Sequence, residues 1–348
     1  MEQSKNTLPG RPRTTLKTLA EHLGLSITTV SRALKNGDEV RPDTIARVQK
    51  VAQELGYRPN TSGLGLKTGK THVIALIMPV LKPGEIVGDV GTLPLIEGLT
   101  AALTDTPYHL TIIPHRPEQD ELEPVKYVVE HGLADGIILN TTRSLDERVK
   151  YLYAEDFPFV TFGRTELSIQ HAFYDTDNAD FSYRAARFMI QRGRKRLMML
   201  TPPKDFLYSW HRLTGFKRAL QESGLPYTEH RQIFIESNAV DYRSLSQQLN
   251  NSEWSPDGYI CGTEISAMGI MAGLHDAGIQ VGIECDVVTM ETSPLPEYFR
   301  VPICGFHQDL HQVGRELSRL LLAQLEQNTP ISQLQVIETA EFINRIDL

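Results

Sequence analysis

Residues 14–60 carry apolar side chains at the spacing of three short amphipathic helices. Apolar residues that recur every three or four positions give a helix one buried stripe, and small polar residues or proline mark its start. The first helix is expected to follow Thr15 and end at Gly24, the second to follow Ser26, and the third to start with Pro42. The positions predicted to be buried are Leu16, Leu19, Ala20, Leu23, Val30, Ala33, Leu34, Ile45, Val48, Ala52 and Leu55.

The glycine between the first two helices makes this module a candidate helix-turn-helix. The second helix of such a module lies in the major groove, with its N-terminal residues at the base edges. Ile27 and Thr28 would then face bases, and Arg32 could donate hydrogen bonds to guanine O6 and N7. Thr29 and Ser31 suit phosphate oxygens. A three-helix domain without a role in DNA binding is the alternative at this point.

From residue 71 onward, short apolar runs alternate with helical stretches. This alternation predicts parallel sheets with helices on both faces, and nine or more units are too many for one small sheet, so two α/β lobes are expected. The expected strands are 72–79, 109–115, 135–140, 157–163, 196–201, 231–236, 257–262 and 285–290. The expected helices are 92–103, 121–132, 144–156, 178–193, 210–224, 242–251 and 264–278.

Charge is distributed unevenly along the 348 residues. The first 70 residues hold 12 basic and six acidic side chains, whereas the remaining 278 have 14 more acidic than basic side chains. A basic head on an acidic body indicates that the head meets a polyanion, although a merely solvated end remains possible. No apolar run is long enough for a membrane span, and the first 16 residues show no secretory signal.

The N-terminal module resembles the DNA-binding head of the LacI/GalR family of bacterial transcription regulators. The resemblance rests on "TLKTLAEHLGLSITTVSRALKN" and "VRPDTIARVQKVAQELGYRPN", of which the "TVSR" core and the terminal "LGYRPN" are the most specific parts. It implies a cytoplasmic, nucleoid-associated homodimer that binds a pseudo-palindromic operator in double-stranded DNA. The residues it assigns to DNA binding are Thr15, Leu16, Ser26, Ile27, Thr28, Thr29, Ser31, Arg32, Asn36, Tyr57, Asn60 and Leu66.

The resemblance also divides the chain into a flexible arm (1–13), the helix-turn-helix domain (14–60), a hinge (61–70) and a two-lobed effector-binding and dimerisation domain (71–348). Leu66 matches the leucine that such hinges wedge into the minor groove, where an apolar side chain can replace base stacking. Two glycines in the hinge disfavour a helix, so order there would have to come from DNA and the partner hinge. A plain flexible linker is the alternative.

For residues 71–348 the resemblance implies a periplasmic-binding-protein-like clamp, with the chain crossing between lobes near residues 163, 291 and 325. The fold class is thus an all-α helix-turn-helix head plus an α/β two-lobed effector domain. Parallel sheets bind ligands at the carboxyl ends of their strands, which places the pocket in the cleft between the lobes. The chain shows no leucine-heptad tail after residue 331, so a dimer is expected and not a tetramer.

The effector is expected to be a small molecule such as a sugar. Arg212 and Gly215 match an R-x-x-G element of the family, in which the arginine fork would hold two vicinal hydroxyls. Trp210 could offer a sugar ring an apolar face or could pack in the core. The long loop around Lys82, Glu85 and Asp89 could contact a second sugar unit, which would favour an oligosaccharide, or could be solvated. The residues assigned to effector binding are Arg164, Trp210, Arg212, Thr263, Glu264, Glu291 and Gln308.

The sequence gives little support to the hypothesis that the protein is an enzyme. A nucleophile elbow, a P-loop and an HExxH motif are all missing from it. His307 and His311 are four residues apart, but no third metal ligand is evident, and the three cysteines are too widely spaced for a zinc site. No cofactor or metal is expected. The alternatives left open are an enzyme or a sugar-binding receptor on the same α/β clamp.

Overall fold

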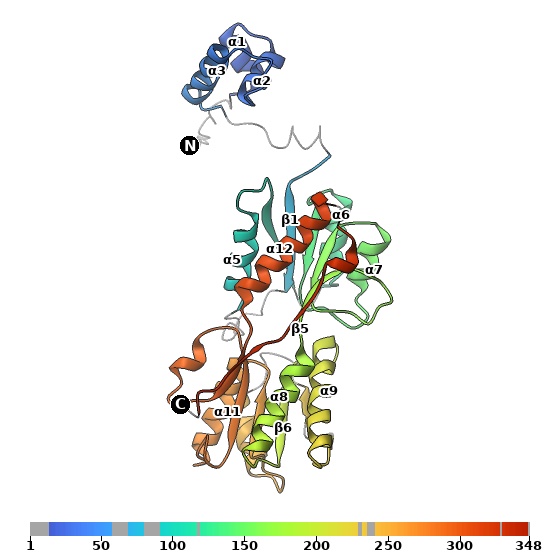
Figure 1. Cartoon of the computed structure of the whole chain (residues 1–348), viewed down its shortest axis with the longest axis vertical. Coiled ribbons are helices and arrows are strands. Elements are labelled where there is room, and N and C mark those ends of the chain that lie inside the picture. Colours follow the sequence, from blue (N-terminus) through green and yellow to red (C-terminus); the bar gives the residue numbers. More distant parts are fainter. Residues whose placement is uncertain are drawn as a thin grey trace, which may run out of the picture. The chain divides into compact units, whose positions relative to one another are not determined.

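A computed structural model describes residues 14–57, 69–79, 91–116, 119–228, 232–234, 241–327 and 329–346 (Figure 1). The chain divides into two compact units, Met1–Lys70 and Thr71–Leu348. The predicted arm at 1–13, most of the predicted hinge, Asn60, Leu66 and the loop residues Lys82, Glu85 and Asp89 lie outside the described residues. None of the helices in the described ranges is long and apolar enough to cross a membrane.

The first unit contains the three predicted helices, α1 (Leu16–Leu23), α2 (Ile27–Leu34) and α3 (Pro42–Glu54). Thr15 and Ser26 cap the first two, because each hydroxyl accepts the backbone N–H three residues further on. Gly24 ends α1 with φ of 64°, a left-handed conformation that glycine adopts without a steric cost. The helices bury Leu19, Ala20, Leu23, Val30, Ala33, Val48 and Ala52. The predicted helix-turn-helix is therefore confirmed as a fold.

The second unit contains two lobes, as predicted, each with a sheet of six strands. The sheet of lobe 1 has the order β11-β5-β4-β3-β1-β2 and is parallel throughout. Its strands are β1 (Val73–Pro79), β2 (His109–His115), β3 (Gly136–Leu139), β4 (Phe159–Phe162), β5 (Ala172–Thr176) and β11 (Gln335–Glu338). The pattern of apolar runs located four of these six strands.

The sheet of lobe 2 has the order β12-β10-β9-β8-β6-β7, with only its edge strand β12 antiparallel to its neighbour among the pairs described. Its strands are β6 (Leu197–Thr201), β7 (Gln232–Phe234), β8 (Gly258–Cys261), β9 (Asp286–Glu291), β10 (Cys304–His307) and β12 (Glu341–Ile343). The strand expected at 231–236 is described only over β7.

Helices cover both faces of each sheet. In lobe 1, α5 (Thr92–Leu103) and α12 (Leu310–Gln327) lie side by side on one face, and α6 (Glu123–Glu130) and α7 (Glu147–Ala154) cover the other (Figure 1). In lobe 2, α8 (Asn178–Gln191) and α9 (Leu207–Glu222) pack together on one face, and α10 (Tyr242–Asn250) and α11 (Glu264–Asp276) cover the other. Two short 3₁₀ helices are η2 (Leu295–Tyr298) and η3 (Ile331–Gln333).

The chain crosses between the lobes three times, but not at the residues expected. It leaves lobe 1 after β5 at residue 176, returns after β10 at residue 307, and leaves again after β11 at residue 338. The expected crossings near 163, 291 and 325 were each one or two elements too early. After each of those residues the chain adds another strand to the same lobe, β5, β10 or β11, before it crosses.

Gly215 allows α9 to pack closely against α8. A Cβ atom at this position would lie 1.9 Å from the carbonyl oxygen of Ala179, a backbone atom that cannot rotate away. We expect Gly215→Ala to destabilise the second unit by about 1–3 kcal/mol, because a forced helix displacement costs packing along the whole contact. Thermal unfolding would measure this loss. Thr214→Ala at the exposed neighbouring position should change the stability by under about 0.5 kcal/mol, and equal effects of both variants would contradict the close contact.

Candidate functional site

Helix α2 presents a polar face with one large apolar side chain. Ile27 is 48% exposed, and Thr28 and Arg32 are exposed beside it. Val30 and Ala33 are buried on the opposite face, which fixes the rotation of the helix. Thr29 and Ser31 are half-buried, and the hydroxyls of Thr29 and Ser26 lie 2.8 Å apart. The side chains predicted to read bases therefore lie on the solvent side of α2.

Arg32 forms an ion pair with Glu39, with Nη1 2.5 Å from Oε2. The turn after α2 brings the two together. Asn36 has φ of 56°, and the N–H of Gly37 donates to the carbonyl oxygen of Arg32 at 2.9 Å. Gln49 donates to the side chain of Asn36 and ties the turn to α3. Both charged side chains are more than half exposed, so the pair adds little stability and Arg32 can exchange this partner for another.

Other predicted DNA-binding residues serve the fold of the module first. Leu16 and Tyr57 pack partly buried against its apolar core, and burial raises the pKa of Tyr57. Thr15 is exposed and caps α1, with its hydroxyl 2.8 Å from that of Thr18. Asn36 is exposed and holds the turn after α2. Leu16 and Tyr57 thus offer only part of each side chain for contact with a partner.

A cavity of about 350 Å³ lies between the two lobes, at the carboxyl ends of their strands. A cavity of this size is in the range that small-molecule ligands occupy. Its apolar lining includes Met78, Leu95, Phe162, Tyr208, Met290 and Leu310. Its polar lining includes Asn140, Thr141, Asp175, Thr176, Asn178, Arg212, Thr263, Glu264, Thr292 and Gln308.

Arg212 is the buried cation of this cavity, and only 7% of the residue is exposed. Its Nε donates to Oδ1 of Asn178 at 2.8 Å, and its guanidinium lies over the rings of Phe181 and Tyr208. Burial lowers the pKa of Arg212 to about 10, so the side chain stays charged at neutral pH. None of the described carboxylates forms an ion pair with it, and a ligand with several oxygen atoms would supply acceptors for its remaining N–H groups.

Asp175 is the acceptor on the lobe 1 side of the cavity. Nε of Arg164 lies 2.6 Å from its Oδ2, and Arg164 also contacts His211 of lobe 2 at 3.3 Å. Burial raises the pKa of Asp175, an effect that the charge of Arg164 only partly offsets. Burial and the same arginine lower the pKa of His211. Arg164, predicted as a ligand-binding residue, thus lies behind Asp175 and orients it.

Thr263 and Glu264 line the lobe 2 side, where both also hold the backbone. Thr263 caps α11 through a reciprocal pair of hydrogen bonds with Ser266. Oε1 of Glu264 accepts the N–H groups of Thr292 and Ser293 at 2.5 and 2.9 Å. Because Oε1 of Glu264 already accepts these hydrogen bonds, it has less capacity to accept hydrogen bonds from a ligand.

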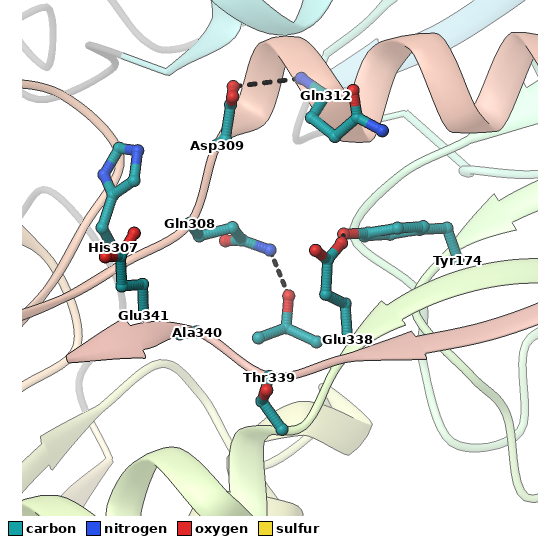
Figure 2. A pocket seen from close by; sticks show the side chains of 10 residues that line it. Tyr174, His307, Gln308, Asp309, Gln312, Glu338, Thr339, Ala340 and Glu341 are labelled. Carbon is teal, nitrogen blue, oxygen red and sulfur yellow. Dashed lines mark hydrogen bonds between the residues drawn. The ribbon is translucent and has the colours of Figure 1, made fainter.

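Gln308 lies where the chain crosses back into lobe 1, and its amide nitrogen donates to the hydroxyl of Thr176. It borders both the large cavity and a smaller one of about 120 Å³, in which Tyr174 donates to Glu338 (Figure 2). The smaller cavity lies among all three crossing segments. Gln308 therefore borders both cavities, beside the segments at which the chain crosses between the lobes.

Three predicted effector-binding residues, Arg164, Trp210 and Glu291, are not among the residues that line the cavity. Trp210 is 43% exposed and absent from the lining, because Tyr208 and Arg212 occupy the inward positions of α9, four residues apart, and Trp210 lies on another face of the helix. Glu291 is buried at the end of β9, where both of its carboxylate oxygens accept hydrogen bonds from Arg345 at 3.0 Å. The structure therefore does not place Arg164, Trp210 or Glu291 against a ligand in this cavity.

We expect Glu291→Gln to destabilise the second unit by about 1–3 kcal/mol, because the guanidinium of Arg345 loses its charged partner. Chemical unfolding would measure the loss. Ligand affinity should stay within about twofold, since Glu291 is not part of the cavity. The double variant Glu291→Met, Arg345→Met should recover stability, because an apolar pair can replace a buried ion pair. If Glu291→Gln lowers the ligand affinity more than about twofold, Glu291 contributes to ligand binding and this prediction is wrong.

The cavity also contains residues that the sequence pattern did not single out as ligand contacts, among them Asn140, Thr141, Asp175, Asn178 and Tyr208. Asn140 and Thr141 follow β3 directly, and Asp175 lies near the end of β5. The position of polar residues at strand ends could have located the first two. Asp175 belongs to a strand that the pattern of apolar runs did not predict.

Two family descriptions match the chain. "Bacterial regulatory proteins, lacI family" matches residues 15–60, and "Periplasmic binding protein-like domain" matches residues 186–345. The HTH-type transcriptional regulator AglR of Rhizobium meliloti (strain 1021) is 32% identical over 314 residues, which are 88% of this chain and 86% of AglR. The similarity to AglR thus extends along most of both chains.

Solved structures share the fold at lower sequence identity. A Lac repressor dimer bound to operator and the anti-inducer ONPF has a TM-score of 0.81 at 16% identity, over 96% of this chain and 98% of that one. A complex of the transcriptional regulator CelR with cellobiose has a TM-score of 0.71 at 22% identity, over 95% of this chain and 99% of that one. These matches bear out the predicted combination of a helix-turn-helix head and a two-lobed α/β domain.

Proposed function

The chain belongs to the LacI family of bacterial regulatory proteins, and from this premise we propose that it represses carbohydrate-utilisation genes until a neutral sugar enters the cavity between its lobes. It is a DNA-binding transcription regulator and not an enzyme. The observation that carries the proposal is the cavity, in which the buried Arg212 of lobe 2 and Asp175 of lobe 1 face one ligand site.

The lining favours a neutral polyol over a phosphate or an apolar ligand. Arg212 offers donors and Asp175 offers acceptors, which suits hydroxyl groups that can both donate and accept. Phe162 and Tyr208 add aromatic surface for the C–H face of a sugar ring. Glu264 adds a second carboxylate to the wall, so positive charge is not in excess as a phosphate would require. The cellobiose complex of CelR, which has the same fold, gives this assignment further support.

We propose that the sugar acts through the angle between the lobes. The cavity takes its walls from both lobes, so a ligand binds one lobe geometry better than another and shifts the population toward it. Operator affinity falls if the preferred geometry separates the two DNA-binding heads of a dimer. The segment at 58–68, which would form the hinge between the units, is outside the described residues, and Leu66 as its minor-groove wedge remains a proposal.

We infer that the regulator works as a homodimer on a pseudo-palindromic operator, in the cytoplasm and at the nucleoid. The Lac repressor structure with the same fold is a dimer on its operator. The chain leaves Leu93 on α5 and Ile112 on the edge strand β2 exposed, and a second copy of the chain would cover these apolar side chains. DNA affinity should fall steeply with salt, because the basic head displaces counterions from DNA.

Thermal unfolding of the full chain against glucose, galactose, maltose, cellobiose, their phosphorylated forms and free nucleobases tests the identity of the effector. We expect one neutral sugar to stabilise the protein by about 2.7 kcal/mol at a concentration of 100 Kd, and to release a bound operator at the same concentration. Stabilisation by a sugar phosphate or a nucleobase alone would contradict the proposal.

A further inference from the structure

Thr141 has an unusual backbone conformation in the wall of the effector cavity. Its φ is 50°, in the left-handed region that β-branched residues avoid, because the branched Cβ crowds the backbone. Four other non-glycine residues in the described ranges have positive φ, and none of them lines this cavity or is β-branched. Strain of this kind persists only where the surrounding structure imposes it, and it gathers at functional sites.

A buried arginine contacts the backbone on both sides of this residue. Nη2 of Arg148 donates to the carbonyl oxygens of both Asn140 and Thr141 at 3.2 Å. The same guanidinium forks onto Asp146, with Nε 2.9 Å from Oδ1 and Nη2 2.7 Å from Oδ2. The side chains of Arg148 and Asp146 are 5% and 1% exposed. The two carbonyls are therefore fixed by a pair that water cannot compete for.

Asp146 is held as firmly as the arginine it holds. Its carboxylate accepts the backbone N–H groups of Arg143 and Arg148, both at 3.0 Å, and caps helix α7. Burial alone would raise the pKa of Asp146, but the hydrogen bonds and charge of Arg148 outweigh it and lower the pKa. A buried ion pair is often no more stabilising than an apolar pair of the same size. Stability alone therefore does not explain why Arg148 and Asp146 are buried here.

The hydroxyl of Thr141 lies against Asn140, which also lines the cavity. The hydroxyl of Thr141 donates to the carbonyl oxygen of Asn140 at 2.7 Å and lies 3.4 Å from its amide oxygen. The hydroxyl thus lies beside the amide oxygen of Asn140, and the amide nitrogen has no acceptor among the described residues. Asn140 lines the cavity on the lobe 1 side, and Arg212 lines it on the lobe 2 side.

We propose that Arg148 and Asp146 are positioning residues for effector recognition, which hold Thr141 in its strained conformation and so fix the amide nitrogen of Asn140 as a donor to an effector hydroxyl. This inference rests on the proposed function of the cavity as a sugar site. The benefit is preorganisation, because a donor that is already fixed loses little conformational entropy when the ligand binds. The loop from Asn140 to Asp146 is thus a rigid part of the sugar site.

The test uses titration calorimetry of the full chain with glucose, galactose, maltose and cellobiose. Thr141→Gly removes the hydroxyl and allows the same φ without strain, so the protein should keep its melting temperature within a few degrees. Its affinity for the sugar that the unaltered protein binds most tightly should fall about 10-fold, because Asn140 is no longer held. Arg148→Lys, which cannot fork, should cost a similar factor, and the two changes together should cost less than their product.

Asp156→Gly is the matched control, because Asp156 also has φ of 50° but lies exposed in the turn after α7. It should leave sugar affinity unchanged. Normal affinity in Thr141→Gly and Arg148→Lys, with affinity lost in Arg212→Met, would overturn this inference and leave the sugar site standing. Absence of binding by the unaltered protein to all four sugars would overturn the sugar site and this inference with it.

Discussion

Replacing Arg212 by methionine is expected to reduce sugar affinity by a factor of about 100 or more. A hydrogen bond to a charged group contributes about 1.5–3 kcal/mol, and the fork of Arg212 can make two of them to vicinal hydroxyls. Methionine fills similar volume without a charge, so the fold should survive the removal of a buried charge that has no ion-pair partner among the described residues. Titration calorimetry with the sugar found by thermal unfolding measures the loss.

The consequence for regulation is a repressor that no longer responds. Operator affinity of Arg212→Met in the absence of sugar should stay within about threefold of the unaltered protein, because Arg212 belongs to the second unit and not to the helix-turn-helix unit. Arg218→Met, on the exposed side of the same helix, is the control and should bind sugar and respond normally. A normal response of Arg212→Met would place the effector elsewhere.

The second large effect is expected from Arg32→Ala in the recognition helix. A bidentate contact between arginine and guanine discriminates against other bases by about 1–3 kcal/mol, and a dimer makes it twice, so preference for the operator over random DNA should fall roughly 30-fold or more. Fluorescence anisotropy with operator and random duplexes at several salt concentrations would separate this loss from the general phosphate attraction.

Arg32→Lys is the informative companion, because it keeps the charge and loses the fork. It should retain affinity for random DNA while it loses preference for the operator. Glu39→Gln removes the partner that Arg32 has in the free protein, and with it one negative charge near the DNA. If Arg32→Ala keeps its full preference for the operator, Arg32 does not read a base, and Ile27 and Thr28 would carry the specificity.

Most of the helices and several central strands could be predicted because each has a local signal, whereas the helix α12 and the internal strands β5 and β10 were not expected. Thr15, Ser26 and Pro42 mark helix starts, and the apolar runs that became β1, β3, β6 and β8 are buried on both faces. Strands β11 and β12 have no such runs, since they are short edge strands with exposed polar residues such as Gln335 and Glu341. Strand β11 pairs with β5, over a hundred positions earlier in the chain, and β12 pairs with β10 after the chain has returned to lobe 2. Local sequence patterns do not contain information about such pairings.

The site was predicted in part for the same reason. Arg212 and Gln308 line the cavity, as predicted from the family motifs to which they belong. Those motifs indicate both the secondary-structure element and the side of it that faces the cleft. Trp210 belongs to the same motif region, but its position on the helix turns it away from the cleft. Glu291 instead forms an ion pair with Arg345, which lies 54 residues further along the chain. The local sequence around Glu291 gives no indication of this partner. Such pairings become visible only when the sheet is assembled.

The central claim is that two copies of the chain read one operator through α2 and release it when a sugar fills the cleft. Selection of bound sequences from a random duplex library, repeated with and without the sugar identified by calorimetry, tests it most directly. The account predicts a single pseudo-palindromic sequence enriched without sugar and little enrichment when the sugar is present. Enrichment of no particular sequence under either condition, or the same enrichment under both, would contradict it.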